Sequence, residues 1–344
     1  VRMDDMFNKV YEKIKNFIRD YWKSIVLLFV SYFVLTFPVP YYIYTGGGTI
    51  NINDRVEVAG TEENSSKGSL NFAYVSELEG NVATYLLSYL LPGWDLEKEE
   101  DYKLSENETQ EDIMLRNHIY LENANQTAIL IAFKKAGKDI TIKNRHFYIL
   151  YIDENSNTTL KVGDEILSVD GQTFSSVTEY SNYITSKTVG DTITFLIKRG
   201  DEKVEAEAEV KDYDGRNLTG ISLSTLYEFE TDPEVTLHFK SSESGPSGGL
   251  MLTLAIYDKL TEGDLTNGKK IVGTGTIEED GSVGEIGGVK YKLSGAVKNH
   301  ADLFLVPAGD NYEEALKEKE KNHYDIEIKA VSTFDEALEI LEEQ

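Results

Sequence analysis

The chain has 344 residues, enough for about two domains, and its hydrophobic content of 40% is sufficient for ordinary packed cores. Its formal net charge of -26 argues against nucleic-acid binding, because a surface that binds phosphates needs clustered Lys and Arg. The absence of cysteine excludes disulfides, thiolate metal sites and cysteine nucleophiles.

The first predicted element is a helix formed by an apolar and aromatic run at residues 25–44. An α-helix of about 20 residues crosses a hydrocarbon core of roughly 30 Å, and Pro38 and Pro40 are expected to end the regular helix near the outer interface. Six Lys and Arg residues precede the run, against four Asp and Glu residues. By the positive-inside rule, we expect residues 1–23 in the cytoplasm, a transmembrane anchor at residues 24–44, and the remainder outside the cell membrane.

A cleaved signal peptide and a buried core helix are the two other interpretations of this run. The first is disfavoured because the preceding region is long and no small-x-small cleavage site follows. The second is disfavoured by the length of the run and by its aromatic flanks, which include Trp22, Tyr41 and Tyr42. The sequence therefore predicts a single-pass, uncleaved anchor.

Residues 45–137 begin with a glycine triplet that predicts a flexible exit from the anchor. Pro92-Gly93 and Gly137 mark the ends of two predicted helices. The expected elements are a strand at 69–78, a helix at 81–91, an acidic loop or helix face at 97–112 and a helix at 117–136.

The next block is rich in β-branched and aromatic residues, beginning at residues 140–152. A run of apolar residues closed by Asp170-Gly171 favours a hairpin, and a helix at 176–186 and a strand at 191–199 follow. This series, from Gly163-Asp164 to the Asp-Gly turn, resembles a PDZ domain, which we place at residues 138–214. The resemblance implies binding of an extended peptide at a sheet edge; the alternative is a domain that only packs against its neighbour.

The last part of the chain alternates strand and helix patterns, as in an α/β or α+β domain. The expected elements are a strand at 302–306, a helix at 311–321, a strand at 324–330 and a helix at 333–343.

A glycine-rich turn, Gly245-Pro246-Ser247-Gly248-Gly249, precedes an apolar helix expected from Leu250. Unobstructed backbone N–H groups beside a serine, together with the positive end of a helix, are suited to holding an oxyanion. A serine hydroxyl still needs a neighbouring base. The alternative interpretation is that Ser247 only caps the helix.

Two lysines, Lys290 and Lys292, lie in the first turn of a helix expected at residues 289–298, after Gly287-Gly288. At about 100° per residue they point to nearly opposite faces, so only one can face Ser247. A buried lysine with a lowered pKa can serve as a base. A surface position is the alternative for either lysine.

The serine and lysine motifs, together with Thr274-Gly275, Ile277 and the strand–helix–strand–helix end of the chain, resemble the proteolytic domain of Lon proteases. The order of anchor, Lon-like segment, PDZ domain and Lon-like core resembles the membrane-anchored, PDZ-containing Lon-like peptidases of Gram-positive bacteria. The resemblance implies Ser247 as nucleophile, Lys292 as base and Thr274 as the residue that orients the lysine. It implies that Gly245 and Gly248 form the active-site turn and that Lys290 lies on the helix surface.

Two features depart from classical Lon enzymes. The residue two before Pro246 is Ser244, where those enzymes often have an acidic residue; Glu243 is adjacent, and neither is assigned a role. No Gly-Lys-Ser or Gly-Lys-Thr occurs, so the ATPase that unfolds substrates is missing and no cofactor is expected.

The predicted fold is α+β, a Lon-type proteolytic domain with an inserted PDZ domain after one transmembrane helix. The predicted parts are a cytoplasmic segment at 1–23, an anchor at 24–44, the first part of the protease domain at 45–137, the PDZ domain at 138–214 and the catalytic core at 215–344.

The predicted function is an ATP-independent serine endopeptidase that cleaves peptides or flexible protein segments outside the cell membrane, with the PDZ domain presenting them. A non-catalytic PDZ adaptor at the membrane is the alternative. A metal-dependent hydrolase is rejected because no His-Glu-x-x-His or similar ligand cluster occurs. The resemblance also implies a homo-oligomer, with hexamer rings as the family's usual form.

Overall fold

The computed structural model describes residues 3–61, 67–105, 107–239 and 245–343. It divides into two compact units, one formed by residues 1–45 and 76–102 and the other by residues 46–75 and 103–344. The mixture of helices and strands confirms the predicted α+β class.

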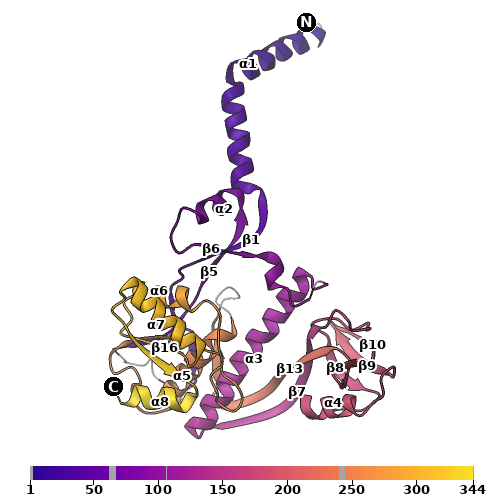
Figure 1. Cartoon of the computed structure of the whole chain (residues 1–344), viewed down its shortest axis with the longest axis vertical. Helices are drawn as coiled ribbons and strands as arrows, with labels where there is room; N and C mark the ends of the chain where they lie inside the picture. Colours follow the sequence, from indigo (N-terminus) through magenta and orange to yellow (C-terminus); the bar gives the residue numbers. More distant parts are fainter. Residues whose placement is uncertain (1–2, 62–66, 106, 240–244, 344) are drawn as a thin grey trace. The chain divides into compact units, whose positions relative to one another are not determined.

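The first unit begins with helix α1 (Met3–Thr36) and contains a small antiparallel sheet (Figure 1). In this sheet β1 (Pro38–Thr45) lies between β5 (Ser76–Asn81) and β6 (Asp95–Lys98). Helix α2 (Val82–Ser88) follows β5 and is capped by Asn81. The short 3-10 helix η1 (Glu99–Tyr102) ends the unit.

The first helix ends just before Pro38 and Pro40, as these prolines predicted, but the last part of the predicted anchor at residues 24–44 is a strand. Helix α1 ends at Thr36, and residues 38–45 form the central strand of the sheet. Pro38 and Pro40 disfavour helical backbone at the residues before them, while the β-branched and aromatic residues between and after them suit a strand. Over the residues that the structure describes, no helix is both long enough and apolar enough to cross a membrane.

A five-stranded sheet organises the part of the second unit that was expected to be the Lon-type domain, in the order β17-β16-β15-β4-β2. Four strands are parallel and the edge strand β2 is antiparallel to β4. The bounds are β2 (Thr49–Asn51), β4 (Ser69–Ala73), β15 (Lys270–Gly273), β16 (Leu303–Pro307) and β17 (Glu327–Val331). A two-stranded sheet pairs β3 (Val56–Val58) with β14 (Val235–Leu237).

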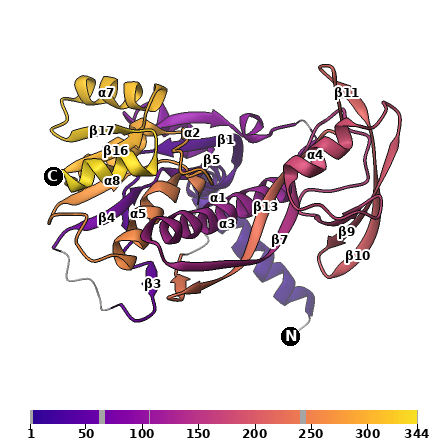
Figure 2. The same ribbon diagram turned by 90° about the horizontal axis from the view of Figure 1, so that it is seen from below.

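Both faces of this sheet are buried, as parallel strands require. Along β16, Leu303 and Leu305 belong to one core, shared with α3, α5 and α8, whereas Phe304 and Val306 belong to the other, shared with α6 and α7. The helices are α3 (Gln110–Ala136), α5 (Gly249–Leu260), α6 (Val289–Lys298), α7 (Asp310–Asn322) and α8 (Phe334–Glu342). Figure 2 shows α3 lying beside α5.

A second five-stranded sheet, β10-β9-β8-β7-β13, lies in the region expected to be a PDZ domain. It surrounds its own core with helix α4 (Val177–Thr185), which is capped by Ser176. The strands are β7 (Asp139–Ile152), β8 (Glu165–Val169), β9 (Thr192–Arg199), β10 (Glu202–Glu209) and β13 (Ile221–Asp232), with a small hairpin of β11 (Lys211–Tyr213) and β12 (Arg216–Leu218) before β13.

The predicted hairpin at Asp170-Gly171 is only a local turn. Both residues adopt positive φ, but the turn closes a single bridge between Val169 and Gln172. Strand β8 pairs instead with β7 and β9.

Strands β7 and β13 form a long antiparallel ribbon, from Ile221 opposite Ile152 to Asp232 opposite Asp139. Its Ile221 end contributes to the core around α4, and Phe229 and Ile140 pack on the core that β16 shares with α3, α5 and α8. The ribbon thus belongs to both halves of the second unit.

Candidate active site

Ser247 lies on a 3-10 turn (η2, Pro246–Gly248) that leads directly into α5. The Gly275 N–H donates to the Ser247 carbonyl oxygen at 2.8 Å, and the Leu250 N–H donates to the Gly275 oxygen at 3.1 Å. These bonds fasten the turn to the segment that follows β15. Backbone hydrogen bonds therefore hold both the Ser247 carbonyl and the first turn of α5 in place.

The glycine that the turn requires is Gly249. A Cβ at this position would lie 2.9 Å from Ile277 Cγ2 and 3.1 Å from the Ile277 nitrogen. Gly245 and Gly248 border Ser247 as predicted and line the same cavity, but a Cβ at Gly248 would make only ordinary contact with Phe72, at 3.8 Å. The Gly248-Gly249 pair in the sequence indicated a close approach of the backbone here, although Gly249 itself was not among the predicted site residues.

Lys292 projects from α6 and is buried, with only 4% of its surface exposed. Its Nζ donates to Thr274 Oγ1 at 3.1 Å, and the Thr274 hydroxyl donates to the Ser247 carbonyl oxygen at 3.1 Å. The structure therefore brings together the three residues that the sequence singled out. Lys290 points elsewhere, with its Nζ 4.8 Å from the centre of the Tyr291 ring.

Burial lowers the pKa of Lys292 from 10.5 to about 8. Within the described ranges Lys292 forms no ion pair, so no carboxylate stabilises its ammonium form. The amine is consequently half neutral near pH 8, whereas an ordinary lysine is almost entirely charged there; the neutral form is the state a base needs.

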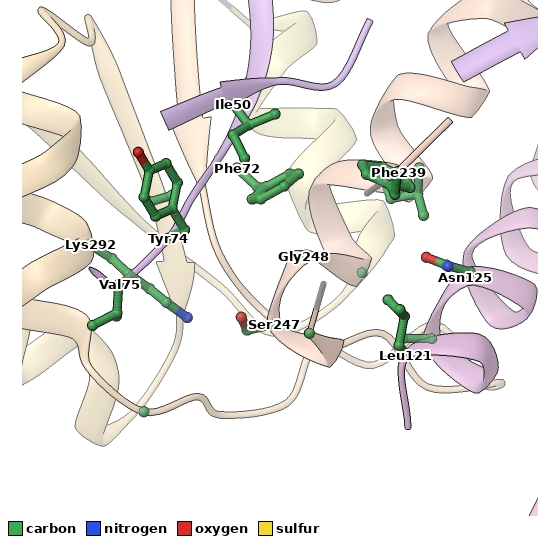
Figure 3. A pocket seen from close by; sticks show the side chains of 16 residues that line it. Ile50, Phe72, Tyr74, Val75, Leu121, Asn125, Phe239, Ser247, Gly248 and Lys292 are labelled. Carbon is green, nitrogen blue, oxygen red and sulfur yellow. The ribbon is translucent and has the colours of Figure 1, made fainter. Parts of the chain in front are cut away.

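The Lys292 amine points toward the Ser247 hydroxyl across the floor of a cavity (Figure 3). Among the described residues the two groups share no direct hydrogen bond; the amine is bonded to Thr274 instead. Catalytic hydrogen bonds are often longer in ligand-free enzymes and tighten when substrate binds. The arrangement places a serine hydroxyl beside a buried amine whose pKa is lowered.

The cavity has a volume of about 530 Å³ and is lined by both apolar and polar groups. Segments far apart in the chain build its walls: β2 and β4 with the residues after β4, helix α3, Phe239 with the segment around Ser247, and Gly287 with Lys292 of α6. The lining residues missed from the sequence are Ile50, Phe72, Ala73, Tyr74, Val75, Leu121, Ala124, Asn125, Phe239 and Leu252. None of them belongs to a recognisable sequence motif. The helix predicted to end before Gly137 corresponds to one part of this lining, the wall formed by α3.

Glu243 and Ser244, the two residues near Pro246 that were left without a role, lie outside the described residues. In the part of the chain that the structure describes, no group of three or more His, Asp or Glu side chains is placed to hold a metal ion.

Comparison with known proteins identifies two domains. Residues 127–210 match the family model of the PDZ domain, and residues 225–343 match the Lon protease (S16) C-terminal proteolytic domain. No curated protein sequence matches the chain.

Solved structures similar to this chain include PDZ domains of Listeria proteins. The PDZ domain of an SdrC-like protein from Listeria monocytogenes is 30% identical, covering 24% of this chain and 92% of that one, with a TM-score of 0.22. The PDZ domain of an SdrC-like protein from Listeria innocua is 35% identical, covering 23% and 92% respectively, with a TM-score of 0.22. With a PDZ domain followed by a Lon-type proteolytic domain, the chain belongs to the PDZ-containing Lon-like serine peptidases.

Proposed function

We propose that this protein is an ATP-independent endopeptidase with a Ser247–Lys292 dyad. The observation that carries the proposal is the buried Lys292 amine, which lacks an ion-pair partner among the described residues, has a pKa of about 8 and faces Ser247 in a cavity. A lysine in such surroundings has no evident structural use, because burial of an amine without a carboxylate destabilises the fold.

The neutral Lys292 amine removes the proton from Ser247 as its hydroxyl attacks the peptide carbonyl. Backbone N–H groups of the Ser247 turn stabilise the oxyanion. The resulting ammonium then protonates the leaving amine, which breaks the peptide bond and leaves an acyl-enzyme. In the second half Lys292 takes a proton from water as the water oxygen attacks the acyl carbon. The bond between the acyl carbon and Ser247 Oγ then breaks, and the Lys292 ammonium returns its proton to Ser247 Oγ, which releases the acid product and restores both groups. Thr274 holds the amine in place throughout.

The substrates are short peptides, flexible tails or exposed loops. What supports this is the absence of a Gly-Lys-Ser or Gly-Lys-Thr nucleotide-binding motif, since without an unfolding ATPase a folded protein cannot be threaded into the cavity. The PDZ domain selects or presents these segments.

We also propose that the first helix attaches the peptidase to a membrane surface, with the catalytic domain outside the cell. The support is a run of large apolar side chains exposed on α1: Val26, Leu27, Leu28, Phe29, Val30, Tyr32, Phe33 and Leu35. Full-length protein should float with lipid vesicles, whereas a chain beginning at Phe37, which keeps β1, should not. Equal flotation of both chains would contradict attachment through α1.

The dyad is tested with the full chain, an unfolded protein substrate and a peptide pool, with new termini read by mass spectrometry. Ser247→Ala and Lys292→Met should abolish cleavage, and Ser247→Ala should also abolish labelling by a fluorophosphonate probe. Lys290→Met is the matched control, because it makes the same change two residues away on α6 and should leave cleavage intact. Cleavage by the Ser247 variant would overturn the dyad; peptide binding without any cleavage would favour the adaptor.

A further inference from the structure

The wall of the cavity opposite Lys292 is aromatic and apolar. Phe72 and Phe239 line it with their ring centroids 6.1 Å apart and their planes at 51°. Leu121 and Ala124 of α3 add further apolar surface, and the alanine leaves room beside the rings. Tilted rings at this spacing favour an aromatic partner, which can pack edge-to-face or offset against them.

Charged side chains are unsuited to this cavity. No described residue of its lining is acidic, so a bound Lys or Arg would have no counter-charge. A bound Asp or Glu beside Lys292 would raise the pKa of the amine and keep it protonated, which would prevent it from acting as a base. The occupant is therefore a neutral side chain.

Asn125 is the polar exception in the apolar wall. It lies one helical turn after Leu121 on α3, is half-buried, and directs its amide toward Gly248 inside the cavity (Figure 3). Its side chain has no hydrogen-bond partner in the described ranges, whereas its neighbours Asn123 and Gln126 are both bonded to β13. A half-buried amide with free donors and acceptor is available to a ligand.

We propose that Asn125 determines substrate specificity, and that the cavity accepts an aromatic side chain whose polar tip hydrogen-bonds to the Asn125 amide. Tyrosine has this combination of an apolar body and a hydroxyl, whereas phenylalanine fits the rings but leaves the amide unpaired. The peptidase thus cleaves at tyrosine in preference to phenylalanine. The inference rests on the proposed function, since it concerns the substrate of the Ser247 site.

The test uses the full chain and two peptides that differ only in Tyr or Phe at the residue whose carbonyl Ser247 attacks. A net hydrogen bond to a half-buried group predicts a kcat/KM about tenfold higher for the Tyr peptide. Asn125→Leu should bring the Tyr-to-Phe ratio of kcat/KM close to one, because kcat/KM should fall for the Tyr peptide and stay unchanged for the Phe peptide. Asn117→Leu is the matched control, because it makes the same change at an exposed position of the same helix and should keep the parent ratio.

A second measurement separates this inference from the proposed chemistry. Binding of the two peptides to Ser247→Ala protein, with and without Asn125→Leu, reads the cavity without any cleavage. Preferential binding of the Tyr peptide that depends on Asn125 supports the inference even if no cleavage is found and the proposed function fails. Equal cleavage and equal binding of the two peptides by the parent would overturn the inference. So would a Tyr-to-Phe ratio of kcat/KM that neither Asn125→Leu nor Asn125→Ala changes, provided that the melting temperature of both variants is unaltered.

Discussion

If Lys292 is the base, as proposed, the activity of the enzyme should depend on pH. Its pKa is lowered to about 8 by burial, so the neutral, basic form increases as the pH rises toward that value. We expect kcat/KM to rise about tenfold per pH unit below pH 7 and to level off above about pH 9. A kcat/KM profile that is flat from about pH 6 to 9 would show that Lys292 is not the base.

The same residue should limit stability. Between its folded pKa of about 8 and the ordinary value of 10.5, the unfolded chain holds more protons, so the free energy of unfolding rises with pH across this interval. Below about pH 8, the folded protein carries a buried ammonium at a cost on the order of 3 kcal/mol. Lys292→Met should therefore raise the free energy of unfolding at pH 7 by about 1–3 kcal/mol and remove its rise between pH 8 and 10. Urea unfolding at both pH values checks this, and a destabilised Met variant would contradict it.

Thr274 positions the amine, because its hydroxyl accepts from Lys292 and donates to the Ser247 carbonyl oxygen. Thr274→Val keeps the shape but loses both bonds, and a displaced base can lower kcat/KM by about 10- to 100-fold. Loss of a hydrogen-bond acceptor also favours the neutral amine, so the midpoint of the pH profile should move to lower pH. Thr274→Ser should restore both activity and midpoint; an unchanged midpoint in the Val variant would indicate a merely structural role.

The sequence pointed to the residues of the proposed dyad more clearly than to the residues that form the cavity wall. Ser247, Thr274 and Lys292 stand in glycine-marked motifs, and the structure brings them together. Asn125 and Leu121 carry no such marks, because their importance depends on which face of a helix happens to meet a cavity built from distant segments.

Two opposite faces of helix α3 contact different parts of the protein. Leu121, Ala124 and Asn125 line the cavity, whereas the opposite face holds the outer edge of β13. There the Asn123 amide donates to the Thr225 oxygen at 2.9 Å, and Gln126 Oε1 accepts from the Tyr227 N–H at 2.6 Å. The helix therefore joins the wall of the cavity to the outermost strand of the PDZ-region sheet.

Removing these amides should loosen β13. Gln126→Ala leaves the Tyr227 N–H without its partner, and each lost bond should lower the free energy of unfolding by about 0.5–1.5 kcal/mol. Hydrogen exchange measured by mass spectrometry should show faster exchange around Tyr227 in Asn123→Ala/Gln126→Ala protein. Asn117→Ala, at an exposed position of the same helix, should leave exchange unchanged. Equal protection in the parent and the double variant would show that the two amides do not hold the strand.

The helix predictions succeeded where caps and periodicity agree. Helix α3 ends at Gly137 in left-handed conformation, and α4 begins after its Ser176 cap. The predicted anchor at residues 24–44 was drawn too long, because hydrophobic length alone does not distinguish a helix from a helix followed by a strand. There the two prolines were the better signal, and the partner strands β5 and β6 lie far along the chain.

Within the second unit, the protease part and the PDZ region have separate hydrophobic cores. The core around α4 is formed by residues between 149 and 223. Among the described residues, the two cores that flank the protease sheet take none from residues 148–224. The parts are joined through β7 and β13, whose pairing continues past residue 147 toward the protease side.

The catalytic part should therefore fold without the PDZ region. Because Phe147 pairs with Thr225, residues 148–224 can be replaced by a two-residue Asn-Gly turn that suits an antiparallel ribbon. The shortened protein should keep Ser247-dependent cleavage of short peptides and its Tyr preference, since the cavity has no described lining residue from the deleted segment. It should lose cleavage of proteins that the PDZ domain selects. A shortened protein that unfolds cooperatively yet cleaves no peptide would show instead that the PDZ region, acting through α3 and β13, is needed to assemble the active site.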